Sequence, residues 1–369
     1  LFLASLQVKA SDLILSTGVR PTLRINGELR ELNMPVLDND DVRRLLFSVI
    51  NQRQRVELEE NRELDFALSV DFGKELNVPN SRFRVNAFFQ RGSLGMVARV
   101  VNVKIPTPAQ LGLPEVVSGL CGKRQGLVLV TGPTGSGKST TLAAMIDYIN
   151  ENKSRHIITI EDPIEFVHTN KLSTIIHREV GIHAQSFPKA LRGAMRSDPD
   201  IVLIGEMRDN ETIRLGLTCA SMGMLVFATL HTNNAPKTID RIIDAFPSDE
   251  QAQIRTMLAE CLQAIVSQLL CRKINGGRVA VHEVLLWADG LPNTIREGQI
   301  SNIRTIIDAG VGRGMQAMDN SIQEQLEAGN ISIEEAYMKA SDKNRFIKQL
   351  EEEEARHRRQ MLMEAKRKK

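Results

Sequence analysis

The sequence has few aromatic residues and no long hydrophobic run. Aromatic side chains make up 4% of the 369 residues, so the core must be mainly aliphatic. No apolar stretch approaches the roughly 18 residues that a membrane-spanning helix requires. The apolar segment 1–8 lacks the basic flank and the length of a signal peptide. These absences exclude a helical membrane protein and predict an aliphatic globular one.

Cysteine and net charge are also low. The four cysteines, at positions 121, 219, 261 and 271, show no C-x-x-C spacing, which argues against a zinc site or a disulfide framework and fits a reducing cytosol. A formal net charge of +2 gives no general argument for nucleic-acid binding. The hydrophobic share of 42% and the charged share of 25% are ordinary for a globular protein, and the length predicts two domains.

What the sequence does contain is a glycine-rich stretch, GPTGSGKS, at residues 132–139. It fits the phosphate-binding loop pattern G-x-x-x-x-G-K-[ST]. A short apolar run precedes it and a helical pattern follows it, so free backbone N–H groups and a helix N-terminus would face an anion. The predicted ligands are ATP and Mg²⁺, and the predicted nucleotide-binding residues are Gly132, Pro133, Thr134, Gly135, Ser136, Gly137, Lys138, Ser139 and Thr140.

Residues 1–102 have the pattern of a small α+β domain. Alternation and composition predict strands at 13–16, 22–25, 66–70, 82–89 and 96–101. Asn26-Gly27 is a hairpin signal, and apolar spacing predicts one helix over 38–58. Pro106, Pro108, Gly112 and Pro114 mark residues 103–116 as a linker, or else as a long ordered loop.

Residues 117–345 read as a βα domain. The short aliphatic runs 127–131, 157–160, 201–204 and 225–230 predict strands that are buried on both faces of a parallel sheet. Apolar periodicity predicts a helix over 249–274 and a second helical region over 292–343. The remaining segment, 346–369, is a charged tail that reads as a solvated helix or as a partner-binding element.

Polar residues follow each of the four predicted strands. Ligands bind outside the carboxyl ends of strands in open α/β sheets, so these residues describe one active site. Glu206 could reach Mg²⁺ or the attacking water, and His231 could sense the γ-phosphate or position water, although a structural role for His231 is equally open. The predicted catalytic acids are Glu206, Glu161 and Glu165, and the predicted metal-binding residues are Ser139, Glu161, Asp162 and Glu206. Each acid alone could instead be a helix cap or a surface ion-pair partner.

The spacing of the motifs does not identify the residue that would place a positive charge opposite the transferred phosphoryl group. Arg84 and Arg99 lie in the small domain, and each could be an ordinary surface residue of a strand. An arginine can also be donated to a nucleotide by a neighbouring subunit, which would require an oligomer.

Taken in order, these motifs resemble the type II/type IV secretion ATPase superfamily. The segments that carry the resemblance are 132–139, 160–166, 198–209 and 229–232. Further segments are similar to its pilus-retraction branch, the PilT/PilU family: 10–13, 82–86, 237–241, 276–280 and 314–316. The resemblance covers the chain up to about residue 345.

The resemblance implies a PAS-like N-terminal domain, a RecA-like P-loop NTPase domain and a hexameric ring. It implies that Glu206 is the catalytic Walker-B glutamate and that Arg84 and Arg99 reach the nucleotide. It also implies a cytoplasmic protein at the inner membrane, with a pilus platform protein and a paralogous ATPase as partners and with no nucleic acid. The implied function is a motor that retracts type IV pili by ATP hydrolysis, as in twitching motility.

Two alternatives stay open within this superfamily. Assembly and secretion ATPases usually carry a four-cysteine zinc insert, whereas residues 271–278 contain one cysteine, which favours retraction. Residues 290–297, GLPNTIRE, match only the second half of the retraction signature AIRNLIRE. This departure and the long charged tail favour a PilU-like accessory module that acts with a main motor.

Overall fold

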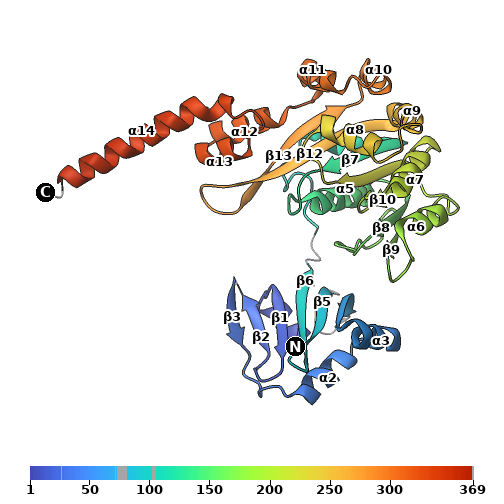
Figure 1. Ribbon diagram of the computed structural model, residues 1–369, viewed down its shortest axis with the longest axis vertical. Coiled ribbons are helices and arrows are strands. Elements are labelled where there is room, and N and C mark those ends of the chain that lie inside the picture. The colour runs from blue at the N-terminus through green and yellow to red at the C-terminus, as the bar shows by residue number, and fades with distance from the viewer. Residues whose placement is uncertain (26, 71, 73–80, 102–104, 368–369) are drawn as a thin grey trace. The chain divides into compact units, whose positions relative to one another are not determined.

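The computed structural model describes residues 1–25, 27–70, 72, 81–101 and 105–367 (Figure 1). Contacts divide the chain into two compact units, Leu1–Lys104 and Ile105–Lys369. Each unit has its own apolar core and is described here by itself.

The smaller unit is built on a six-stranded antiparallel sheet of order β3-β2-β1-β6-β5-β4. Its strands are β1 (Asp12–Ser16), β2 (Thr22–Ile25), β3 (Glu28–Glu31), β4 (Glu63–Val70), β5 (Ser81–Gln90) and β6 (Ser93–Val101). Its helices are α1 (Phe2–Gln7), α2 (Asn39–Phe47) and α3 (Gln52–Asn61). Leu13, Leu46 and Phe83 are fully buried between sheet and helices. The five predicted strands are confirmed, while Asn26 of the predicted hairpin lies outside the described residues.

The single helix predicted over 38–58 is wrong, because the chain forms two helices there. Each helix begins with its own capping box, at Asp38 for α2 and at Asn51 for α3. The Asn51 side chain accepts a hydrogen bond from Gln54 N, and the Gln54 side chain accepts one from Asn51 N. This reciprocal pair satisfies two backbone donors at a new helix start, so the chain restarts where apolar periodicity alone suggested continuation.

The larger unit contains a seven-stranded sheet of order β13-β12-β7-β11-β10-β8-β9. Its strands are β7 (Gly126–Thr131), β8 (His156–Glu161), β9 (Thr174–Glu179), β10 (Ile201–Ile204), β11 (Leu225–Leu230), β12 (Leu262–Arg272) and β13 (Arg278–Leu286). All neighbouring strands are parallel except the antiparallel pair β12–β13. The predicted α/β fold, with four buried strands at its centre, is confirmed.

Helices cover both faces of this sheet. Along β7, Leu127 and Leu129 belong to one apolar core, whereas Val128 and Val130 belong to the other, as the alternation of a strand requires. The first core also takes in α6 (Phe187–Ala194), α7 (Asn210–Ser221), α8 (Ala235–Asp244) and α9 (Gln251–Cys261). The second takes in α4 (Glu115–Leu120) and α5 (Lys138–Asn152). The sheet edge where β7, β8, β10 and β11 end is left to loops.

The helix predicted over 249–274 is only half correct. Helix α9 ends at Cys261, and the chain continues as β12, which pairs with β7 in the middle of the sheet. Nearly every residue from Leu262 to Val266 is buried, because β12 is covered on both faces. A continuous apolar run of this kind cannot be distinguished from a buried helix by periodicity.

The remaining helices form the C-terminal part of the chain. They are α10 (Leu291–Arg296), α11 (Ile303–Ala309), α12 (Met318–Glu327), α13 (Ile333–Lys339) and α14 (Asn344–Arg367), with short 3-10 turns at Ile300–Asn302 and Val311–Arg313. The region predicted to be helical, 292–343, is confirmed. Figure 1 shows α14 extending away from α12 and α13, and the fully buried Phe346 anchors its first turn in their apolar cluster. No helix within the described residues is both long and apolar enough to cross a bilayer.

Candidate active site

The glycine-rich stretch forms the turn between β7 and α5. Gly132–Gly137 make the loop, and Lys138, Ser139 and Thr140 form the first turn of the helix. Gly135 and Gly137 have φ angles of 78° and 89°, the left-handed conformation that glycine adopts without strain. Lys138 Nζ donates hydrogen bonds to the carbonyl oxygens of Gly132, at 2.8 Å, and Pro133, at 3.1 Å. The lysine is thereby held against the loop.

Two observations show that this loop suits an anion. The hydroxyl oxygen of Ser136 is buried and has no hydrogen-bond partner among the described residues, so it is available to a ligand. Burial lowers the pKa of Lys138, while nearby Glu206 opposes that effect. A phosphate would add the negative charge that a partly buried ammonium group needs. The predicted nucleotide-binding residues are therefore chemically suited to a nucleoside triphosphate.

Glu206 lies at the centre of a charged cluster beside the loop. It follows β10, and His231 follows the adjacent strand β11, which brings His231 Nε2 to 3.2 Å from Glu206 Oε1. Arg208 Nη2 lies 2.9 Å from Glu206 Oε2 on the other side. Burial by itself would raise the pKa of Glu206, but the hydrogen bond and charge of Arg208, together with His231, lower it overall. Glu206 is thus held as a carboxylate.

The second acidic group lies at the end of β8. Glu161 Oε2 accepts a hydrogen bond from Glu165 N at 3.3 Å, so the carboxylate helps to shape the segment that follows the strand. Glu161 and Ser139 line the same small cavity, of about 20 Å³, together with Gly205 and Thr229. Asp162 is exposed, and its charge helps to raise the pKa of Arg208, after the larger effect of Glu206. The two predicted acidic groups therefore meet beside the loop.

Among the described residues, the predicted magnesium site does not contain a complete set of protein ligands. Within the described part of the chain, no three His, Cys, Asp or Glu side chains gather closely enough to hold a metal. Mg²⁺ usually takes one or two protein ligands and completes its octahedron with water and phosphate oxygens. The Ser139 hydroxyl and the Glu161 carboxylate, which share one cavity, fit that pattern. The metal set of Ser139, Glu161, Asp162 and Glu206 stays a prediction.

Comparison with known proteins identifies the family. The model of the family described as "Type II/IV secretion system protein" matches residues 107–368, more than half of the chain. The chain belongs to this family. The predicted superfamily and the predicted enzyme class, an ATPase, are therefore confirmed.

Several secretion-system family members are similar over nearly their whole length. "Type IV pilus retractation ATPase PilT" of Pseudomonas aeruginosa is 48% identical, over 91% of this chain and 96% of PilT. "Type IV pilus ATPase PilU" of the same organism is 39% identical, over 90% of this chain and 86% of PilU. The crystal structure of the "Pilus Retraction Motor PilT and Bound ADP" superposes with a TM-score of 0.86 at 43% identity, covering 93% and 97% of the two chains.

The two arginines predicted for the site belong to the smaller unit. Arg84 on β5 and Arg99 on β6 are directly opposite each other in the antiparallel register, so both lie on one face of that sheet. Both side chains are exposed, and Arg99 Nε donates a 2.9 Å hydrogen bond to Oδ1 of the buried Asp12. Asp12 thus orients Arg99 within its own unit. The role of these arginines at a nucleotide stays a prediction.

Arg208 is a site residue that sequence reasoning missed. It stands two positions after Glu206 in the same loop, and its guanidinium group contacts the Glu206 carboxylate. Spacing alone gives no signal for this pair, because nothing in the sequence pattern ties an arginine to a glutamate two positions earlier in a loop. The hydrogen bond depends on how the chain turns after β10, which the sequence pattern does not define.

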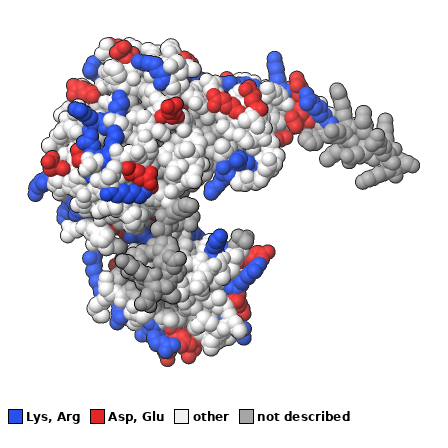
Figure 2. All heavy atoms as spheres, turned by 180° about the vertical axis from the view of Figure 1, so that it is seen from behind, with Lys and Arg blue, Asp and Glu red and all other residues white. Residues whose placement is uncertain are grey.

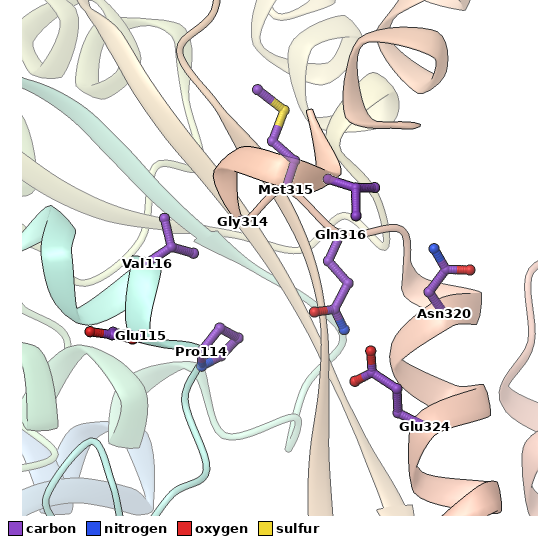
Figure 3. A pocket seen from close by; sticks show the side chains of 9 residues that line it. Pro114, Glu115, Val116, Gly314, Met315, Gln316, Asn320 and Glu324 are labelled. Atoms are coloured by element: carbon purple, nitrogen blue, oxygen red, sulfur yellow. The ribbon is translucent and has the colours of Figure 1, made fainter. Parts of the chain in front are cut away.

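Another cavity of this family member lies elsewhere in the larger unit. It measures about 570 Å³ and lies between the start of α4 and α12, as Figure 3 shows. Pro114 and Val116 line one side, and Gln316, Asn320 and Glu324 line the other. No residue of the phosphate loop borders it. The cavity is therefore separate from the candidate active site.

Proposed function

We propose that this chain is a motor ATPase that retracts type IV pili. The observation that carries the proposal is the meeting of the phosphate loop, Glu206 and His231 at the ends of three neighbouring strands, β7, β10 and β11. This arrangement puts a phosphate-binding loop next to an ionised carboxylate that can act on water. The likeness to PilT over nearly the full length of both chains supports retraction as the work that hydrolysis drives.

The proposed roles follow from the position of each group. Lys138 and the loop N–H groups bind the phosphates, and Glu206 orients the attacking water and accepts its proton, with Arg208 and His231 holding its carboxylate in place. Ser139, Glu161 and Asp162 would hold Mg²⁺ with Glu206, and Glu165 supports the Glu161 carboxylate through its backbone. The metal would neutralise charge on the phosphate oxygens when bound.

The rest of the proposal concerns the assembly. We propose a homo-hexamer in which Arg84 and Arg99 stabilise the charge of the transferred phosphoryl group. The motor would act in the cytoplasm, peripherally to the inner membrane, on a pilus platform protein. On the face of the larger unit seen in Figure 2, Lys and Arg side chains are interspersed with Asp and Glu, so this face offers no continuous basic track for nucleic acid.

The matched variants Glu206→Gln and Glu211→Gln test the enzymatic part. Glu206→Gln is expected to bind ATP as the wild type does, while kcat falls by about 100-fold or more, because the amide cannot take a proton from water. Glu211 is exposed on α7 and pairs with Arg192, so its amide variant should keep wild-type kcat. Turnover near the wild-type level in Glu206→Gln would exclude Glu206 as the catalytic group.

A strain that lacks this protein tests whether the motor retracts pili or assembles them. If the motor retracts pili, the strain should keep surface pili and lose twitching, whereas loss of an assembly or secretion ATPase would remove the pili or block secretion. Complementation with the wild-type chain and with Glu206→Gln shows whether hydrolysis is needed.

A PilU-like accessory module is the second candidate. It is favoured by residues 290–297, which depart from the retraction signature and form α10, with Leu291 and Ile295 packed into the core. An accessory module should hydrolyse ATP slowly alone and restore twitching only when a main motor is present. Measuring ATPase activity with and without such a motor separates the two candidates.

A further inference from the structure

The phosphate loop rests on a residue from a distant part of the sequence. Strand β12 pairs with β7, and the side chain of Gln268 on β12 is buried beneath the loop. Its amide nitrogen donates a 2.7 Å hydrogen bond to the carbonyl oxygen of Ser136. Its amide oxygen accepts a 2.7 Å hydrogen bond from the hydroxyl of Thr141, the fourth residue of α5. One side chain therefore ties the loop to the helix that follows it.

The loop is also shaped around this strand. A Cβ atom at Gly132 would lie 2.3 Å from the carbonyl oxygen of Gln268, and one at Gly137 would lie 2.9 Å from its amide nitrogen. The contact at Gly132 is with backbone and leaves no room for a side chain, whereas a Cβ at Gly137 would push the Gln268 amide away from its place beneath the loop. The glycines and the glutamine are complementary parts of one contact.

The hydrogen bond to Ser136 has a consequence for anion binding. In a trans peptide the C=O of one residue and the N–H of the next point in opposite directions. Since Gln268 holds the Ser136 carbonyl toward the sheet, the N–H of Gly137 is turned the other way. Loops of this type bind phosphate through backbone N–H groups turned away from the protein. Without the amide, this peptide is free to rotate and turn its oxygen toward the anion.

We propose that Gln268 is a positioning residue that keeps the phosphate loop in its nucleotide-binding shape through the Ser136 carbonyl and the Thr141 hydroxyl. The inference rests on the proposed nucleotide site. Gln268 acts through the loop and touches neither substrate nor metal, so its loss should weaken nucleotide binding more than it weakens folding.

The test uses Gln268→Met, which keeps a similar volume but removes both hydrogen bonds. Its Kd for ADP should be weaker by about tenfold or more, the expected result of leaving buried polar partners unsatisfied. Thr141→Val removes one of the two bonds and should weaken binding less, and Thr141→Ser, which keeps the hydroxyl, should restore wild-type affinity. The control is Ser267→Ala, which removes the buried Thr131–Ser267 hydroxyl pair on the same two strands and should bind ADP normally.

Thermal unfolding with and without ADP separates positioning from general stability. Positioning predicts that Gln268→Met and Ser267→Ala have similar Tm values without nucleotide, while only Gln268→Met loses most of the rise in Tm that ADP causes. Wild-type affinity for ADP in folded Gln268→Met would overturn the proposal. If Gln268→Met does not fold, equal affinity of Thr141→Val and Thr141→Ser would overturn it. Failure of the wild type itself to bind ADP would contradict the nucleotide site as a whole.

Discussion

Asp147 on α5 contacts two side chains, Lys171 and His168, near the small cavity beside Ser139. Its Oδ1 lies 2.9 Å from Lys171 Nζ and 3.8 Å from Nδ1 of the buried His168, which lines that cavity. The His168 ring in turn stacks on His177, with centroids 5.7 Å apart. The interaction with His168, and then that with Lys171, lowers the pKa of Asp147 from 3.8 to about 2.

This shift makes a prediction for stability against pH. A carboxylate whose pKa is lower in the folded state stabilises the protein above its unfolded pKa and loses that contribution as the pH falls. The free energy of unfolding of wild type minus Asp147→Asn should be largest above about pH 5 and should shrink as the pH falls from 3.8 toward 2. Urea unfolding between pH 3 and pH 7 measures it.

The matched control is Glu151→Gln, because Glu151 pairs with the same lysine, at 2.7 Å, but its side chain is 50% exposed. An exposed ion pair contributes little, so this variant should lose less stability than Asp147→Asn at pH 7. A difference between wild type and Asp147→Asn that stays constant with pH would rule out the proposed contribution of the carboxylate.

At the residue scale, the sequence predicts groups at strand ends better than it predicts what supports them. Glu206 and His231 could be placed together because the carboxyl ends of parallel strands share one sheet edge. Gln268 could not be placed, because it meets Ser136 across 132 positions and lies inside a segment that reads as helix. Its contact becomes visible only once β12 is known to lie beside β7.

At the element scale, the predicted helices and strands differ from the observed ones where two structural signals compete. Over 249–274 the apolar spacing is helical throughout, yet hydrogen bonds to β7 and β13 stabilise a strand from Leu262 onward. Over 38–58 the competing signal is local and is present in the sequence, as the N-x-x-Q capping pattern that begins at Asn51. The start of α3 is therefore predictable from the sequence, whereas the start of β12 depends on long-range pairing.

The capping box at Asn51 can be tested directly. Asn51→Ala removes the side-chain acceptor for Gln54 N, which should lower the stability of α3 by about 1 kcal/mol. Amide hydrogen exchange in α3 should then be faster by roughly fivefold, the factor that corresponds to this energy. The control is Gln52→Ala, a change at the first helical position without a capping bond. Equal exchange in α3 of both variants would show that α3 does not depend on its cap.

At the scale of the whole molecule, the residues proposed for the active site belong to two compact units. The loop, Glu206 and His231 belong to Ile105–Lys369, whereas Arg84 and Arg99 belong to Leu1–Lys104. Glu206 and His231 of the first set are in contact within one unit. Subunit mixing distinguishes arginines that act within their own copy from arginines that act on a neighbouring copy.

We predict that Arg99→Ala and Glu206→Gln complement each other in mixed rings. If the arginine acts on the nucleotide of a neighbouring copy, some interfaces of a mixed ring carry both native groups, so the mixture should hydrolyse ATP faster than either variant alone. A control mixture in which one chain carries both substitutions and the other carries Glu206→Gln should stay inactive. An inactive Arg99→Ala and Glu206→Gln mixture, with subunit exchange verified by labelled chains, would contradict donation between copies.

The length of helix α14 determines how far its end would move if its base rotated. It comprises 24 residues, and its core anchor among the described side chains is Phe346, near its first turn. A straight helix of that length spans about 36 Å, so a rotation of roughly 10° at its base would carry the far end through about 6 Å. A rotation of α12 and α13 would therefore move the far end of the helix further than its base. A fluorophore placed near that end would report such a rotation.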